Sequence, residues 1–295
     1  MKKIYLIFAL LGTALFAACD PVEDDYGNNI SAITAADQIK ATVTVEALNG
    51  KNVNKVHVDA DGNSIPIQLS NGVNTAYSTV ADFLLFGVGE NVVYISAQNP
   101  DGTVVTKEVT VNVDEMHYDV PEQYALLTNN ASKTWTWDTD VNGGAWGNFG
   151  YQAGSGEDFA LNGNGTWFSC PPSDLAGQLQ HSSSGKVTGE ESDNAYMVWS
   201  LNGTKIETFA PDGKLIRSGK FNIEDYDKKI DGWSIGTLNT TAESILWPWK
   251  INGNGYAPTS FQVIQLDESK MVLVYADDKL SAWGEATFWR FKAKE

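Results

Sequence analysis

The chain has 295 residues, which is long enough for two domains that each bury a hydrophobic core. Its 37 Asp and Glu outnumber its 20 Lys and Arg, and the resulting formal net charge of -17 excludes a nucleic-acid partner because phosphates would be repelled. The 27 glycines and many aromatic residues, with few long stretches of helix-forming residues at helical spacing, predict an all-β protein of short strands and tight turns.

The first residues have the pattern of a secretory signal. Two lysines follow the initial Met, residues 4–16 are apolar, and Ala17 and Ala18 precede Cys19. This segment resembles a bacterial lipobox, the motif in which the cysteine thiol is acylated and becomes the mature N-terminus. The resemblance implies a lipoprotein signal peptide over residues 1–18 and lipidation of Cys19. The alternative is an ordinary secretory signal with an incidental cysteine.

An acidic, polar run over residues 19–29 follows the signal and predicts a flexible tether. An acidic run directly behind a lipidated cysteine also resembles the surface-export signal of Bacteroidota lipoproteins. This resemblance implies a protein that is lipid-anchored in the outer membrane and exposed at the cell surface. A solvated spacer without an export role is the alternative.

The second cysteine of the chain, Cys170, has no partner for an intramolecular disulfide if Cys19 carries lipid. We therefore expect it to be a buried small hydrophobic residue.

Residues 30–115 contain strand patterns separated by turn signals. The clearest pair is a hairpin in which residues 89–97 and 103–113 alternate apolar and polar positions around the turn Asn99-Pro-Asp-Gly102. A Gly-rich entry, a Val-Tyr-Ile strand, this turn and a closing Val-rich strand resemble the polycystic-kidney-disease-type (PKD-like) modules of bacterial surface proteins. The resemblance implies an N-terminal Ig-like β-sandwich that spaces the next domain from the membrane.

Residues 116–295 are predicted to form a larger C-terminal domain. A polar linker over residues 114–121 leads into a short helix expected at 121–127, and strands follow. Turn sequences such as Asn202-Gly203 join successive strands, which predicts an antiparallel meander closed as a β-sandwich or barrel. The expected strands are residues 133–137, 165–170, 195–201, 204–210, 214–223, 233–238, 244–251, 261–266, 271–276 and 286–292.

The closing strands of this domain resemble those of Bacteroidota lipocalin-like and surface glycan-binding lipoproteins. The resemblance lies in the runs that begin at Phe261, Met271 and Phe288, and the Lys133-Thr-Trp-Thr-Trp-Asp opening supports it. It implies carbohydrate binding, in which the protein captures an extracellular polysaccharide or oligosaccharide for the outer-membrane glycan transporter of a polysaccharide-utilisation system. The alternatives are a structural or adhesive surface lipoprotein whose tryptophans are all core, and a glycoside hydrolase.

Four tryptophans stand beside glycine or proline in stretches that predict loops at the rim of the domain, where an indole could stack on the C–H face of a sugar. Two of them flank Pro248, which cannot donate a hydrogen bond within a central strand. The expected glycan-binding residues are Trp146, Trp247, Trp249 and Trp283. Trp199 and Trp289 lie inside predicted strands and are expected in the core.

The segment Asp138-Thr-Asp-Val-Asn-Gly143 has oxygen donors at its first, third and fifth positions, like the front of a calcium-binding loop. Phe149 stands where the closing acid of such a loop belongs. One interpretation is therefore a calcium site formed by Asp138, Asp140 and Asn142, and the other is a plain Asx turn. No other cofactor is expected.

Glycoside hydrolases need two carboxyl groups that flank the scissile bond. Closely spaced acid pairs occur in this chain, but all lie in or beside predicted turns, and the three histidines stand near no hydrolase motif. We therefore expect a binding protein and not an enzyme. The acid pairs are Asp138 with Asp140, Glu157 with Asp158, Glu190 with Glu191, and Asp277 with Asp278.

Overall fold

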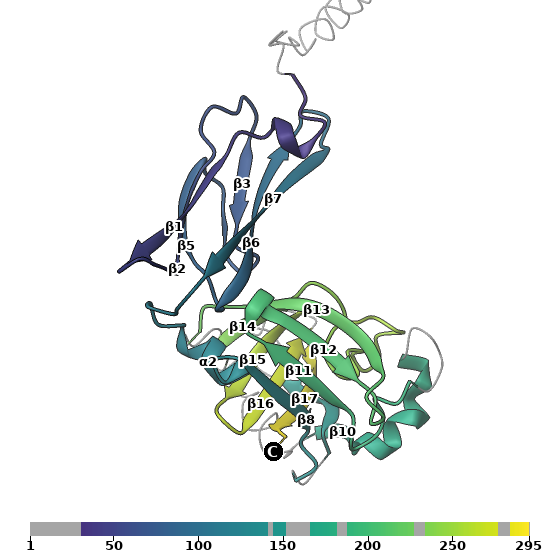
Figure 1. The fold of residues 1–295 in the computed structure, drawn as a ribbon. Coiled ribbons are helices and arrows are strands. Elements are labelled where there is room, and N and C mark those ends of the chain that lie inside the picture. The colour runs from purple at the N-terminus through teal and green to yellow at the C-terminus, as the bar shows by residue number, and fades with distance from the viewer. Residues whose placement is uncertain are drawn as a thin grey trace, which may run out of the picture.

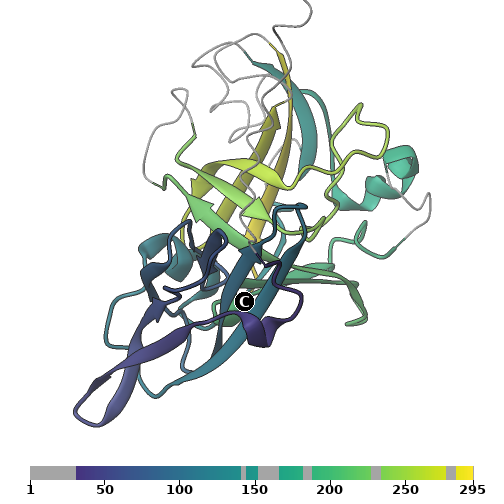
Figure 2. The same ribbon diagram turned by 90° about the horizontal axis from the view of Figure 1, so that it is seen from above.

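The computed structural model describes residues 31–140, 144–151, 166–181, 188–226, 234–276 and 284–294. The protein is all-β, with 51% strand and 9% helix. Figure 1 shows two β assemblies, one above the other, formed by residues 42–113 and 132–293. Seen from above, the first assembly (purple and blue) lies over one part of the second (Figure 2). No helix in the described part of the chain has the length and apolar character needed to cross a membrane.

The first assembly consists of two antiparallel sheets with the strand orders β1-β2-β5 and β4-β3-β6-β7. Alternate residues of both sheets face each other, so that Val56 and Val58 of one sheet and Val93 and Ile95 of the other are fully buried in one core. The immunoglobulin-like topology that we expected stays a prediction. The elements are η1 (Ala36–Gln38), β1 (Thr42–Leu48), β2 (Lys51–Asp59), β3 (Ile67–Ser70), β4 (Thr75–Ala76), β5 (Val80–Leu84), β6 (Gly89–Gln98) and β7 (Val104–Val113).

The predicted hairpin between β6 and β7 is confirmed. The pairing is continuous from Gly89 opposite Val113 to Gln98 opposite Val104. Asn99 begins the turn, and its buried side chain accepts a hydrogen bond from the Ile33 N–H (2.9 Å) and donates one to the Ile33 carbonyl (2.9 Å). The turn therefore also fixes the segment that enters the sandwich.

Helix α2 (Glu122–Thr128) confirms the short helix predicted after the linker. It begins after Pro121 and ends at Asn129, whose left-handed φ of 51° stops the helix. The helix buries Tyr124 and Leu127 against the second assembly, where the indole N–H of Trp135 donates to the Leu127 carbonyl (2.9 Å).

The second assembly is a closed barrel of eight strands, so the sequence-based alternatives of sandwich and barrel resolve in favour of the barrel. Successive strands pair antiparallel from β11 to β17, and β8 closes the ring by pairing with both β11 and β17. The barrel strands are β8 (Ser132–Trp137), β11 (Tyr196–Ser200), β12 (Lys205–Phe209), β13 (Leu215–Glu224), β14 (Gly236–Thr240), β15 (Ser260–Leu266), β16 (Lys270–Ala276) and β17 (Gly284–Ala293).

A strand that we did not predict, β9 (Trp146–Tyr151), continues the line of β8 along the same edge of β17. Trp137 pairs with Phe291 and Trp146 with Trp289, so the chain leaves the ladder after Trp137 in β8 and rejoins it at Trp146 in β9. The Arg290 backbone joins the two, because its N–H donates to the Ala145 carbonyl (2.8 Å) and its carbonyl accepts from the Asp138 N–H (3.0 Å). Strand β10 (Thr166–Cys170) pairs with the other edge of β9 and extends this sheet beyond the barrel.

Residues 244–251, predicted as a strand, form none. Trp247 has a φ of 46°, outside the range of a strand, and Pro248 has no N–H for a ladder. The apolar pattern of this segment instead reflects its path through the barrel interior, where Ile245, Leu246 and Trp247 are fully buried. The remaining short elements are η2 (Pro172–His181) and η3 (Asn202–Thr204).

Candidate functional site

Three of the four tryptophans predicted to hold a glycan lie in the core of the barrel. Trp146 and Trp247 are fully buried and Trp249 is 2% exposed. The ring of Trp247 lies 6.3 Å from that of Trp146 and 4.9 Å from that of Trp249, both nearly perpendicular. The predicted exposure is therefore wrong, because β9 carries Trp146 onto the inner face of the barrel and residues 244–251 run through the interior. Trp199 and Trp289 are buried as expected.

The tryptophan cluster is tied together by its own backbone. The indole N–H of Trp146 donates to the Trp249 carbonyl (3.1 Å), and that of Trp289 donates to the Trp247 carbonyl (2.7 Å). Because residues 244–251 join no strand ladder, the carbonyls of Trp247 and Trp249 need other donors, and the indole N–H groups supply them. The cluster is a structural unit, and its rings cannot stack on a polysaccharide at the surface.

A buried ion pair supports the same cluster. The fully buried carboxylate of Glu190 accepts hydrogen bonds from both terminal nitrogens of Arg217. It also accepts one from the backbone N–H of Trp247 (2.8 Å). The Arg217 guanidinium lies 4.8 Å from the centre of the Trp249 ring. The neighbouring Glu191 accepts from the Gly189 N–H (2.9 Å). Both carboxylates of this acid pair therefore accept hydrogen bonds from donors within the protein itself.

The predicted calcium ligands are engaged by lysines. Asp138, which is buried, lies 2.6 Å from Lys270 Nζ, and Asp140 lies 2.8 Å from Lys292 Nζ, whose hydrogen bond holds the pKa of Asp140 below its ordinary value. The Asp140 N–H donates to Asp138 Oδ1 (3.2 Å), which is the Asx turn of the alternative interpretation. Among the described residues, no three His, Cys, Asp or Glu side chains gather closely enough to hold a metal ion. A calcium ion would have to displace both ammonium groups.

Cys170 is buried, as expected, and burial raises the pKa of its thiol to about 12. The other predicted positions lie outside the described residues. They are Cys19, Asn142, Glu157, Asp158, Asp277, Asp278 and Trp283.

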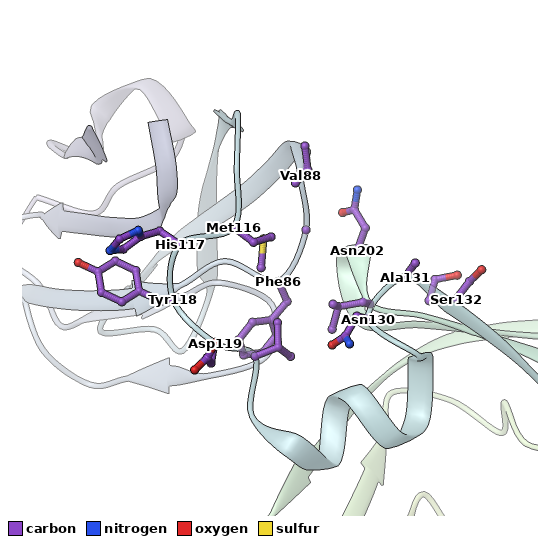
Figure 3. Close-up of a pocket in the computed structure, with 14 residues that line it drawn as sticks. Phe86, Val88, Met116, His117, Tyr118, Asp119, Asn130, Ala131, Ser132 and Asn202 are labelled. Carbon is purple, nitrogen blue, oxygen red and sulfur yellow. The ribbon is translucent and has the colours of Figure 1, made fainter. Parts of the chain in front are cut away.

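A cleft of about 670 Å³ lies where the two β assemblies meet. In Figure 3, Val88 and Met116 stand on one side of it, and Asn202, Ala131 and Ser132 stand on the other. The first side comes from the loop between β5 and β6 and from the linker. The second comes from the turn between α2 and β8 and from the end of β11.

Close contacts beside the cleft fix its two sides relative to each other. The rings of Phe86 and Tyr124 lie 4.8 Å apart, and Phe86 belongs to the apolar cluster of the barrel. A Cβ atom on Gly87 would fall 3.1 Å from the Cβ of Asn202, so a larger residue at position 87 would push the η3 turn away by a few tenths of an ångström. The cleft is thus a consequence of how the assemblies dock, with its width set by residues that touch across the contact.

The two sides of the cleft differ in chemistry. Val88 is 56% exposed and Met116 is 36% exposed, which leaves an apolar surface open to solvent. On the opposite side, Asn130, Ser132 and Asn202 form no side-chain hydrogen bond or ion pair within the described part of the protein. Their amide and hydroxyl groups are available to a ligand.

Little in the sequence predicts this cleft. The sequence of residues 114–121 indicates only a linker, and Asn202-Gly203 indicates only a turn, and the structure has both. The polar composition of these segments is typical of loops, and nothing in it indicates that they face each other. The site is formed only where the two β assemblies dock.

Comparison with known proteins finds neither a protein-family model nor a curated protein that matches the chain.

Proposed function

We propose that the protein is a cell-surface lipoprotein that binds an extracellular polysaccharide, and that the sugar chain binds in the cleft between the two β assemblies. The observation that carries this proposal is the pairing of an exposed apolar side with a side of unengaged amide and hydroxyl groups. A pyranose ring has the same two kinds of surface, an apolar C–H face and a rim of hydroxyls that both donate and accept hydrogen bonds.

Size and charge support a neutral sugar. The volume of about 670 Å³ falls within the range of roughly 300–1,000 Å³ that is usual for small-ligand sites. Of the described residues that line the cleft, none is Lys or Arg, and Asp119 contributes a carboxylate. With a formal net charge of -17 for the chain, an anionic polysaccharide would be repelled and a neutral one would not.

The proposed location rests on the N-terminal sequence. Lipid on Cys19 and the acidic run behind it would hold the folded assemblies outside the outer membrane, where they could pass the captured glycan to a transporter. The linker and the cleft lie between the assemblies, so the ligand would contact both.

A structural or adhesive role is the second candidate, because the tryptophans serve mainly as core. Ten occur in the chain, and two of them, Trp233 and Trp283, fall outside the described residues. Of the eight that remain, seven are buried. Aromatic abundance therefore gives no support to carbohydrate binding, and the argument depends on the cleft.

The test is affinity electrophoresis of the purified protein in gels that contain β-glucan, xylan, galactomannan, starch or mucin, with reducing-sugar release measured in parallel. We expect retardation by at least one neutral polysaccharide and no release of reducing ends. Retardation by none would favour the structural role. Steady release of reducing ends would assign the protein to the glycoside hydrolases.

A further inference from the structure

Trp167 is the single exposed residue among the eight tryptophans that the structure describes, and 58% of it is open to solvent. It lies at an irregularity of β10, where the register with β9 shifts between Thr166 and Phe168. A β-bulge of this kind turns a side chain away from the direction that strict alternation would give it. The position of Trp167 is therefore set by the backbone and not by a flexible loop.

The indole of Trp167 lies over Gly150 of the neighbouring strand. A Cβ atom on Gly150 would fall 2.2 Å from Cζ2 of the ring, so any other residue at position 150 would displace it. Gly150 and Asn148 are two residues apart on β9 and therefore face the same side of the sheet. The exposed ring and the Asn148 side chain consequently share one face.

Polar groups lie next to the ring on that face. Gly150 is paired with Glu285 of β17, which brings the carboxylate one strand away from the indole. Glu285 Oε1 accepts hydrogen bonds from the side-chain amides of Asn148 and of Asn252 (2.9 Å for the latter). Asn148 is only 5% exposed, yet its Oδ1 has no hydrogen-bond donor in the described structure. A buried acceptor without a donor is costly unless a water or a ligand hydroxyl satisfies it.

Asn148 belongs to a row of paired residues that crosses four strands. Tyr275 of β16 pairs with Thr287 of β17, Thr287 with Asn148 of β9, and Asn148 with Phe168 of β10. Three inter-strand spacings separate the ends of the row, which amounts to roughly 14 Å. Aromatic residues thus lie at both ends of the row, with the Asn148 amide between them and the Glu285 carboxylate two residues from Thr287 along β17. The Thr287 hydroxyl is buried and accepts a hydrogen bond from the Ile251 N–H (3.1 Å), so it serves the fold.

We propose that this face, which we call the β10 face and define by Trp167, Phe168, Asn148, Glu285 and Tyr275, is a second carbohydrate contact in addition to the cleft. The proposal rests on the proposed function, since it takes the same class of ligand, a neutral oligosaccharide segment. The Trp167 ring stacks on the C–H face of one sugar unit. Glu285, held in place by two amides, accepts hydrogen bonds from the sugar hydroxyls.

The test compares Trp167→Ala, Trp167→Phe and Glu285→Gln with the wild-type protein, using the polysaccharide that retards the wild type in the panel described above. Tyr77→Ala is the matched control, because Tyr77 is 85% exposed and lies on the first assembly. We expect Trp167→Ala to weaken binding by at least about 10-fold, as an aromatic hot spot does. Trp167→Phe should retain most of the affinity, and Tyr77→Ala should leave it unchanged.

Thermal melting distinguishes binding from a structural role for the ring over Gly150. An exposed ring that serves the ligand predicts a fall in Tm of no more than about 4 °C for Trp167→Ala. A fall as large as that of the core variant Trp199→Ala would overturn the inference. If Trp167→Ala does not fold, Glu285→Gln decides, because it has nearly the same shape and keeps an oxygen to accept from Asn148 and Asn252. A loss of affinity in that variant supports the proposal and unchanged affinity overturns it.

Failure of the inference differs from failure of the proposed function. If the wild type binds a polysaccharide and Trp167→Ala binds it equally well, the β10 face is not a contact and the cleft stands alone. If the wild type binds none of the polysaccharides, both proposals are overturned together.

Discussion

The ring of Phe86 lies 4.8 Å from the ring of Tyr124, so a loop of the first β assembly and helix α2 beside the barrel share one apolar contact. Val73 and Phe86 belong to the hydrophobic cluster of the barrel, and Lys220 of β13 donates to the hydroxyl of Tyr94 on β6 (2.9 Å). The polar linker therefore joins two units that also touch through buried side chains. This contact gives the cleft its fixed sides.

Removing the Phe86 ring should loosen the cleft. Phe86→Ala is expected to lower the free energy of unfolding by about 3 kcal/mol, since it deletes a buried aromatic ring. We also expect limited proteolysis to cut the linker near Met116 faster, because the contact beside it is lost. Tyr77→Ala, which removes an exposed ring, should change neither quantity. Identical melting and cleavage for Phe86→Ala would show that the contact does not hold the assemblies together.

The buried tryptophans should behave as core residues. Trp146→Ala and Trp247→Ala are each expected to cost about 3–5 kcal/mol of stability, as Trp199→Ala is, because each removes a buried indole. Urea unfolding followed by circular dichroism measures the cost. If a variant at either position unfolds at the wild-type urea concentration and binds polysaccharide more weakly, that tryptophan contacts the ligand at the surface and is not a core residue.

Acid should weaken the turn between β15 and β16. Burial opposes ionisation of Asp267, but hydrogen bonds from Ser269, Lys270 and Gln265 outweigh it and hold the pKa of Asp267 below 3.8, its ordinary value. A carboxyl group with a lowered pKa in the folded state stabilises the fold above the unfolded pKa, and this stabilisation is lost as the pH falls through the folded value. We expect Asp267→Asn to be less stable than the wild type at pH 7 and to lose less stability between pH 4 and pH 2. Parallel pH profiles of stability would contradict this.

Lipidation of Cys19 is expected to decide where the protein resides. Cys19→Ala should move it from the detergent phase to the aqueous phase in phase partitioning of whole cells, because the acyl chains are the proposed anchor. An antibody against the folded assemblies should label intact wild-type cells. Continued partitioning of the variant into detergent would refute the anchor, and labelling only after permeabilisation would refute surface exposure.

Local patterns predicted much of the fold. Alternation over residues 89–113 gave a hairpin with the observed turn, and most barrel strands were found within a few residues of their true ends. Sequence patterns do not indicate strand β9, because Gly147 and Gly150 interrupt its alternation and Gly143 and Gly144 precede it. Its pairing partner β17 lies far along the chain. Residues 244–251 have the apolar content of a strand, but Pro248 and the positive φ of Trp247 keep them out of any ladder.

Exposure of the tryptophans could not be predicted from their neighbours. The rule that loops expose rings and strands bury them failed in both directions, since Trp247 is buried in an irregular segment and Trp167 is exposed on a strand. In the first case tertiary packing decided the outcome, and in the second a bulge did. The cleft also depends on tertiary packing, because Val88 and Asn202 face each other across it only through docking of the two assemblies.

The central claim, that the cleft binds a neutral glycan, is tested most directly by titration calorimetry of Asn130→Gly against Asn49→Gly. Both asparagines are exposed and have left-handed backbones, with φ of 58° for Asn130 and 52° for Asn49, so glycine suits both positions. Only Asn130 lines the cleft. With a polysaccharide that the wild type binds, Asn130→Gly should raise Kd by roughly 3- to 10-fold through the loss of its hydrogen bonds, and Asn49→Gly should leave Kd unchanged. Equal Kd values for both variants and the wild type would contradict the account.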